Sequence, residues 1–188
     1  MRVKPAIELS IVCRKVRFAT RGLTGALGEV LRMMGVKEGV WNIVLVGDED
    51  MKELHQRHLG IGTTTDVLTF DMGEEMPSAE CGMRNQVELE SVICLDEARR
   101  RAGEMGHSVG DEVLLYAVHS LLHVMGYDDV TAAGARHMHA REDEILSAVG
   151  VGAVFGGKLK TRNSKHQTAS RLRKGRTLHG RAVSEVGR

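Results

Sequence analysis

The most constraining feature of this 188-residue sequence is a strongly apolar run that contains two histidines. Residues 114–125 read LLYAVHSLLHVM, in which His119 and His123 are four positions apart. On an α-helix, residues i and i+4 lie on the same face, one turn apart. The spacing therefore predicts a helix that brings two imidazoles side by side, where both can reach one metal ion.

The residues that follow this run can end the helix and supply further metal ligands. Gly126 can adopt the positive φ that often ends a helix, and Asp128 and Asp129 come directly after the turn. Two histidines and one carboxylate leave one coordination position open. Three protein ligands plus a water molecule are the usual arrangement of catalytic zinc. His137 and His139 are alternative third ligands.

The same spacing is also compatible with a structural role for the two histidines. A histidine in an apolar helix is often a core or surface residue, and pairs at this spacing occur by chance. A buried pair is harder to explain in this way, because each buried imidazole needs a polar partner. The residues alone leave metal binding and a structural role equally open.

Hydrophobic periodicity and turn signals divide the chain into short strands and helices. Asp48 and Asp111 are the expected N-caps of the second and fourth helices. The order β-α-β-α-β-β-α-α-α predicts an α+β fold with α/β-like features. It contains a four-stranded mixed sheet and about five helices, and the metal site lies on a helix that borders a cleft. Strands are expected at residues 7–12, 41–46, 67–71 and 87–94, and helices at residues 16–34, 49–59, 95–105, 111–125 and 131–149.

Charge separates the chain into an acidic body and a basic C-terminal segment. The whole chain has a net charge of +1, but residues 157–188 contain ten Lys or Arg and a single Glu. Residues 1–156 then contain 16 basic and 24 acidic side chains, a net charge of −8. We expect one domain at residues 1–156 and a disordered tail at residues 157–188. The tail is either a solvated appendage or an arm that binds RNA phosphates.

No segment predicts export or insertion into a membrane. No apolar run reaches the ~20 residues of a membrane span, and charged residues interrupt the N-terminal segment where a signal peptide would need an apolar core. The three cysteines are widely spaced and form no C-x-x-C clamp, which favours a reducing compartment. We therefore expect a cytoplasmic protein that does not bind membranes and is a monomer or a weak oligomer.

Three segments of the chain share their order and spacing with a known family. Residues 65–70 read TDVLTF, residues 119–129 read HSLLHVMGYDD, and Met138 and Glu142 are four positions apart. They resemble the T-D-V-L-S-F, H-G-x-L-H-L-x-G-Y-D-H and M-x-x-x-E motifs of the YbeY family of bacterial rRNA-maturation endoribonucleases. The resemblance implies that His119, His123 and Asp129 are the catalytic residues and bind one divalent metal ion, with Zn²⁺ as the expected ion.

The chain departs from the pattern of this family at three positions. Asp129 stands where the family has a third His; carboxylate is an ordinary zinc ligand, but its charge should make the metal a weaker Lewis acid. Ser120 replaces a Gly of the family. Family members often contain an Arg shortly before T-D-V-L, where this chain has Leu59, and Arg57 is the nearest candidate.

Arg57, Thr65 and Asp66 are the candidate substrate-binding residues. Thr65 and Asp66 precede a strand that should line the cleft, and they either orient the substrate or form a hydrogen-bonded turn. The Arg run at residues 99–101 could contact phosphates. A charged helical surface of this kind is more often simply solvated.

The resemblance implies a single-strand-specific, metal-dependent endoribonuclease of rRNA processing, which matures the 3′ end of 16S rRNA and takes part in ribosome quality control. Its expected partners are single-stranded rRNA and the small ribosomal subunit. Ser120 cannot supply the general base that Glu provides in H-E-x-x-H peptidases. Two alternatives stay open: a metal-dependent hydrolase of a non-RNA substrate, and a non-catalytic ribosome-assembly factor with a structural metal. The sequence does not fix whether water or the RNA 2′-hydroxyl attacks.

Overall fold

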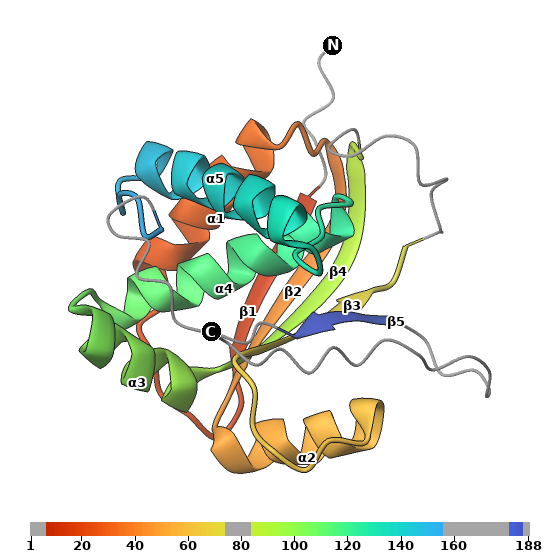
Figure 1. Ribbon diagram of the computed structural model, residues 1–188, viewed down its shortest axis with the longest axis vertical. Coiled ribbons are helices and arrows are strands. Elements are labelled where there is room, and N and C mark those ends of the chain that lie inside the picture. The colour runs from red at the N-terminus through yellow and green to blue at the C-terminus, as the bar shows by residue number, and fades with distance from the viewer. Residues whose placement is uncertain (1–6, 74–83, 156–180, 186–188) are drawn as a thin grey trace.

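A mixed five-stranded sheet forms the centre of the molecule (Figure 1). The computed structural model describes residues 7–73, 84–155 and 181–185. Strands β1, β2 and β4 are parallel to one another, whereas β3 is antiparallel to both of its neighbours, β4 and β5. Across the sheet the strand order is β1 (Ile7–Cys13), β2 (Glu38–Val46), β4 (Gln86–Cys94), β3 (Val67–Asp71) and β5 (Arg181–Glu185).

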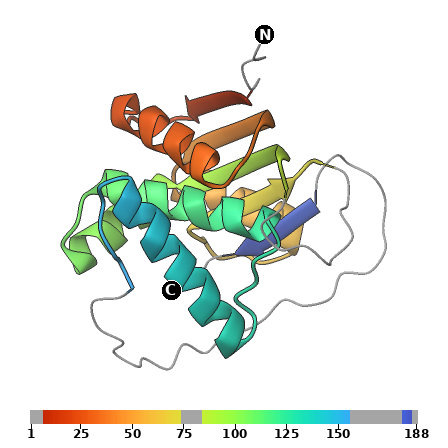
Figure 2. The same cartoon turned by 90° about the horizontal axis from the view of Figure 1, so that it is seen from above.

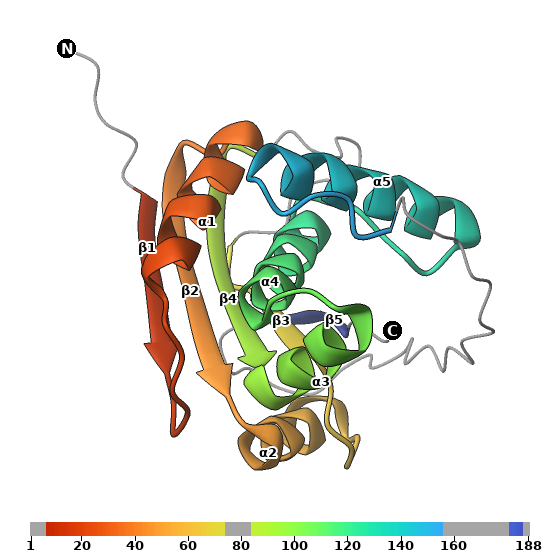
Figure 3. The same cartoon turned by 90° about the vertical axis from the view of Figure 1, so that its left-hand side faces the viewer.

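Within the described residues, five helices surround this sheet, and most of them pack together on one side of it. Helix α4 lies across the sheet, with α1 and α5 beside it (Figure 3). Helix α3 packs against α4, whereas α2 contacts β4 and α3 at the end of the molecule. The helices are α1 (Arg21–Met33), α2 (Asp48–Leu59), α3 (Leu95–Met105), α4 (Val109–Val124) and α5 (Ala132–Ala148).

Two separate hydrophobic clusters cover the two faces of the sheet. Side chains of a strand alternate between the faces, so Trp41, Ile43 and Leu45 of β2 join α1 and α4 in the main core. Val46 of β2 faces the other way and packs with Met51 of α2 in a smaller cluster. Helix α4 therefore lies on the face opposite to α2, with α1 and α5 on its own side (Figure 2).

Helix α4 is the most deeply buried helix. Every residue from 112 to 124 is buried, which explains why its sequence is almost continuously apolar rather than amphipathic. Burying a Leu or Val side chain contributes about 1.5–3 kcal/mol, so this helix has a large share of the main core. Of the helices that the structure describes, none combines the length and apolar character needed to cross a lipid bilayer.

The predicted fold class is confirmed, and the main difference is at the C-terminus. The four expected strands form a mixed sheet with five helices, and β5 joins it at the edge of β3. The sequence did not predict β5 because RAVSE has a single large apolar residue and lies in a basic segment. Most of residues 157–188 lie outside the described residues, so the domain boundary and the disordered tail stay predictions.

Both predicted N-cap residues, Asp48 and Asp111, are wrong: they lie one and three residues after the observed N-caps. The N-cap of α4 is Ser108, whose hydroxyl accepts the N–H of Asp111 while the Asp111 carboxylate accepts the N–H of Ser108. The N-cap of α2 is Gly47, and Asp48 is the first helical residue, paired with Arg100. Carboxylates are favoured throughout the first turn of a helix, so the sequence alone does not separate these positions.

A chain of buried hydroxyl groups joins α4 to the sheet. The Thr69 hydroxyl of β3 donates to the Ser120 hydroxyl at 2.9 Å, and Ser120 Oγ lies 2.7 Å from Ser91 Oγ of β4. The indole N–H of Trp41 donates to Ser91 Oγ at 2.9 Å. All four side chains are buried. Ser120, which stands in place of the family's Gly, is thus a contact between helix and sheet.

Candidate metal centre

His119 and His123 lie on consecutive turns of α4, and their rings meet. The two Nε2 atoms are 2.8 Å apart, and the ring centroids are 4.5 Å apart with an interplanar angle of 72°. Both side chains are almost fully buried, with 4% and 6% of their surface exposed. The i,i+4 spacing therefore has the geometric result that the sequence predicted.

The turn after α4 brings a carboxylate to the same place. Gly126 has a φ of 89°, a conformation that glycine adopts without strain. The chain then reverses, and Asp129 Oδ1 lies 3.8 Å from His123 Nε2. Ligand atoms of His119, His123 and Asp129 all lie within 4.8 Å of one another. Among the residues that the structure describes, this is the one group of three His, Cys, Asp or Glu side chains that could hold a metal ion.

Each imidazole is held in place through its other ring nitrogen. Nδ1 of His119 lies 2.7 Å from Oε1 of Glu142, a fully buried residue of α5. Nδ1 of His123 lies 3.1 Å from the backbone oxygen of Tyr127. A carbonyl oxygen only accepts hydrogen bonds, so His123 donates from Nδ1, and an ionised Glu142 requires the same of His119.

This pattern of hydrogen bonds suits a cation at the point where the ligand atoms converge. With both protons on Nδ1, the Nε2 atoms of His119 and His123 direct lone pairs toward each other, beside the Asp129 carboxylate. Burial, and then the proximity of His119, lowers the pKa of His123 to about 4, so this ring is neutral at pH 7. Neutral imidazole and carboxylate are the forms that bind metal ions, and a divalent cation would replace the lone-pair repulsion with three bonds.

The other candidate ligands near this group have different contacts. Asp128 accepts the backbone N–H of Val130 at 3.0 Å, as expected for a residue of the turn. His137 packs on the ring of Tyr127, with centroids 5.2 Å apart. His139 stacks on an aromatic ring at the end of the C-terminal loop. Neither alternative histidine belongs to the group of three.

The candidate substrate-binding residues lie on other segments of the fold than the three candidate ligands. Arg57 is on α2, which packs on the opposite face of the sheet, and it is paired with Glu53. Thr65 and Asp66 are buried just before β3. The Thr65 hydroxyl and the N–H of Val67 both donate to Asp66 Oδ1, at 3.1 and 2.9 Å. Their contacts with substrate stay a prediction.

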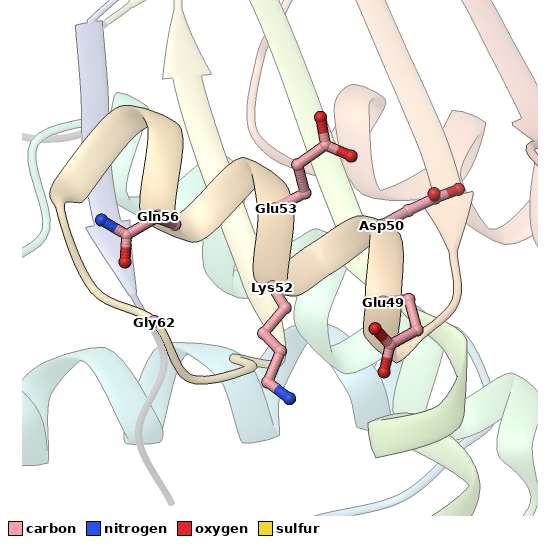
Figure 4. Close-up of a pocket in the computed structure, with 6 residues that line it drawn as sticks. All are labelled: Glu49, Asp50, Lys52, Glu53, Gln56 and Gly62. Carbon is pink, nitrogen blue, oxygen red and sulfur yellow. The ribbon is translucent and has the colours of Figure 1, made fainter.

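A shallow depression on the surface of α2 is separate from the candidate metal centre. Three of its six lining residues are acidic, and the stick view shows these three side chains pointing in different directions from one helix (Figure 4). Because α2 and α4 cover opposite faces of the sheet, this depression has no part in the histidine group. Its lining residues are Glu49, Asp50, Lys52, Glu53, Gln56 and Gly62.

Sequence reasoning gave no role to Glu142, which is in direct contact with the candidate ligands. The only indication of a role was its position in the M-x-x-x-E motif, four residues after Met138. A Glu on a helix is ordinarily exposed to solvent. Burial of Glu142 depends on α5 crossing α4. A buried carboxylate of this kind commonly fixes the ring orientation of a metal-binding histidine.

The fold and the converging side chains define a class of protein, namely an α+β protein with a candidate His-His-carboxylate metal centre on a buried helix. A family model described as Endoribonuclease YbeY matches residues 15–150. The chain belongs to the YbeY family, which confirms the resemblance found in its sequence.

Curated relatives and a solved structure agree with this assignment. Endoribonuclease YbeY of Moorella thermoacetica is 38% identical over 138 residues, 69% of this chain and 88% of that protein. Endoribonuclease YbeY of Anaeromyxobacter sp. is 35% identical over 150 residues, 79% of this chain and 75% of that protein. The solution structure of a Thermotoga maritima protein, 20% identical, covers 75% of this chain and 88% of its own with a TM-score of 0.53, which supports the fold.

Proposed function

We propose that this protein is a metal-dependent endoribonuclease of rRNA processing in which His119, His123 and Asp129 hold one divalent cation. Membership of the family described as Endoribonuclease YbeY supports RNA cleavage. The observation that most supports the metal is the 2.8 Å separation of two Nε2 atoms whose rings each have an oxygen within hydrogen-bond distance of Nδ1. Imidazole and carboxylate ligands suit Zn²⁺, the ion that we propose.

The side chains around the centre have separate tasks. When bound, the cation would supply Lewis-acid stabilisation of the negative charge that grows on a phosphoryl oxygen. Glu142 and the Tyr127 carbonyl keep the two imidazoles oriented and their protons on Nδ1. Asp129 adds one negative charge and is the most exposed member, at 19% of its side chain against 4% for His119 and 6% for His123. RNA would therefore approach from the side of Asp129.

The proposed substrate is single-stranded rRNA, including the 3′ end of 16S rRNA in the small ribosomal subunit. Family membership supports rRNA processing. The ten basic residues after position 157 support attraction to phosphates by a body whose net charge is −8. We propose a cytoplasmic location and a monomeric or weakly oligomeric state.

The decisive experiment combines metal content with RNA cleavage. The double variant His119→Ala/His123→Ala should lose its metal, measured by elemental analysis, and its cleavage of single-stranded RNA, while circular dichroism stays unchanged. His139→Ala is the matched control, because it removes a nearby histidine that lies outside the group. Undiminished cleavage by the double variant would overturn the proposal.

Two further measurements separate the proposed nuclease from the alternative functions. Chelator-sensitive hydrolysis of a peptide or small ester, without cleavage of RNA, would favour a different hydrolase. A tightly bound metal with no cleavage of any substrate would favour a structural metal in an assembly factor. The nuclease proposal requires RNA cleavage that a chelator abolishes and that added Zn²⁺ restores.

A further inference from the structure

Two aromatic rings lie against each other next to the candidate metal centre. Tyr127 comes from the turn after α4, and His137 comes from the second turn of α5. Their ring centroids are 5.2 Å apart, and the ring planes are inclined by 37°. Tyr127 is half-buried and His137 is exposed. Tyr127 also packs against the edge of the main core, so the pair lies between the core and the solvent.

Tyr127 is one of three aromatic residues of this protein that are partly exposed, with Phe18 and Phe155. The chain contains six Phe, Trp and Tyr residues, and Trp41, Tyr116 and Phe70 are buried in the two clusters. Residues of this type usually reach the core because burying a ring stabilises the fold strongly. A tyrosine at the edge of the core whose ring meets an exposed histidine therefore suggests a contact with something outside the chain.

The pair and the candidate metal ligands share one short segment. The backbone oxygen of Tyr127 accepts the hydrogen bond from His123 Nδ1 at 3.1 Å. Asp129 follows two residues later in the same turn. In a nucleotide, only the ribose separates the phosphate from the base. A strand whose phosphate lies at the centre can therefore place a neighbouring base near the residues of this turn.

We propose that Tyr127 and His137 form a stacking subsite for one nucleobase of single-stranded RNA beside the phosphate held at the centre. This inference rests on the proposed function and adds a base-binding site to it. Stacking on aromatic rings accepts any base, so the subsite would bind RNA without reading its sequence. It would also favour single strands, because the bases of a duplex are already stacked on one another.

The first test measures binding to a short single-stranded 2′-O-methyl RNA by fluorescence anisotropy with zinc-loaded protein. Loss of a stacked aromatic costs about 1–3 kcal/mol, which corresponds to roughly 5- to 150-fold in affinity. Because the pair is partly exposed, we expect Tyr127→Leu and His137→Ala each to weaken binding by about 5- to 10-fold. Tyr127→Phe and His137→Phe, which keep a ring, should restore most of the affinity.

The matched control is His139→Ala, which removes a histidine from the same helix. Its ring is stacked on Phe155, with centroids 4.0 Å apart, and should not contact RNA. We expect the His139→Ala variant to bind RNA within about twofold of the original affinity. An equal loss of RNA binding in this variant would show a general effect on α5 and would overturn the subsite.

The second test removes the base instead of the ring. Oligonucleotides with one abasic position, moved along the strand, should include one that binds the original protein about 5- to 10-fold more weakly. His137→Ala should show no additional loss on that oligonucleotide, because the stacking partner is already absent. Equal losses in the variant and in the original protein would mean that the base contacts other residues.

Zinc affinity separates a binding role from a structural one. If Tyr127 and His137 only support the turn that holds Asp129, Tyr127→Leu and His137→Ala would weaken zinc binding in parallel with RNA binding, and the subsite would be refuted. We expect unchanged zinc affinity. Failure of the proposed function would differ from both outcomes, since the zinc-loaded original protein would then not cleave RNA at all.

Discussion

Replacing Glu142 by Gln should weaken zinc binding without unfolding the protein. Glu142 is fully buried, and its Oε1 lies 2.7 Å from Nδ1 of His119. Loss of a partner behind a metal-binding histidine typically costs 10- to 100-fold in metal affinity. The Gln amide oxygen can still accept the Nδ1 proton but has no charge, so we expect about tenfold, or about 1.4 kcal/mol. Glu142→Leu removes the acceptor and should approach 100-fold.

Zinc affinity of the metal-free protein can be measured by competition with a chromogenic chelator, and urea unfolding checks that each variant folds. The matched control is Glu112→Gln, because Glu112 of α4 is also a buried carboxylate paired with a histidine, His107, which lies just before that helix. That pair lies about two turns before His119, so Glu112→Gln should change stability and leave zinc affinity unchanged. The reasoning is refuted if Glu142→Gln and Glu142→Leu both bind zinc as the original protein does.

Four other changes test separate parts of the structure. Ser120→Ala should lower the free energy of unfolding in urea by about 1–3 kcal/mol, because two buried hydroxyls lose a partner; an unchanged value would contradict this role. Burial raises the pKa of the Cys94 thiol to about 11, so at pH 8 a thiol reagent should modify Cys13 before Cys94, and stability should fall as the pH rises from about 9 to 11, since the folded state keeps the proton longer. Asp129→His should keep one zinc per chain and raise the cleavage rate, because a neutral ligand leaves the cation a stronger Lewis acid; a slower variant with full zinc content would argue against this view. Replacing the eight Lys and Arg of residues 158–176 by Gln should weaken RNA binding and reduce its dependence on salt concentration, and no change in either would remove the basic segment from RNA binding.

Local sequence patterns predicted the part of the candidate centre that depends on a single helix and its turn. The i,i+4 spacing of His119 and His123 fixes their relative position once a helix forms. Gly126 then allows the reversal that brings Asp129 back. Strand and helix positions followed from periodicity in the same way, and β3 was predicted at its observed bounds, Val67–Asp71. These features need no knowledge of distant contacts.

Features that depend on contacts between distant segments were not predicted. Glu142 meets His119 only because α5 folds back across α4, and 23 positions separate the two residues. Arg57 was a candidate by its distance from T-D-V-L along the chain; the sequence did not indicate that α2 packs on the face of the sheet opposite to α4, and the contact of Arg57 with RNA stays a prediction. Strand β5 pairs with a strand more than a hundred residues earlier. Periodicity along the chain contains no information about such pairings.

The hydroxyl chain that joins Thr69, Ser120 and Ser91 affects the direction in which the histidine side chains of α4 point. Successive residues of an α-helix point about 100° apart around its axis, so anchoring Ser120 to the strands also sets the direction in which His119 projects. Rotation of the helix on the sheet would break these buried hydrogen bonds. Ser120 thus fixes the rotation of α4 about its axis, and this keeps the rings of His119 and His123 directed toward each other.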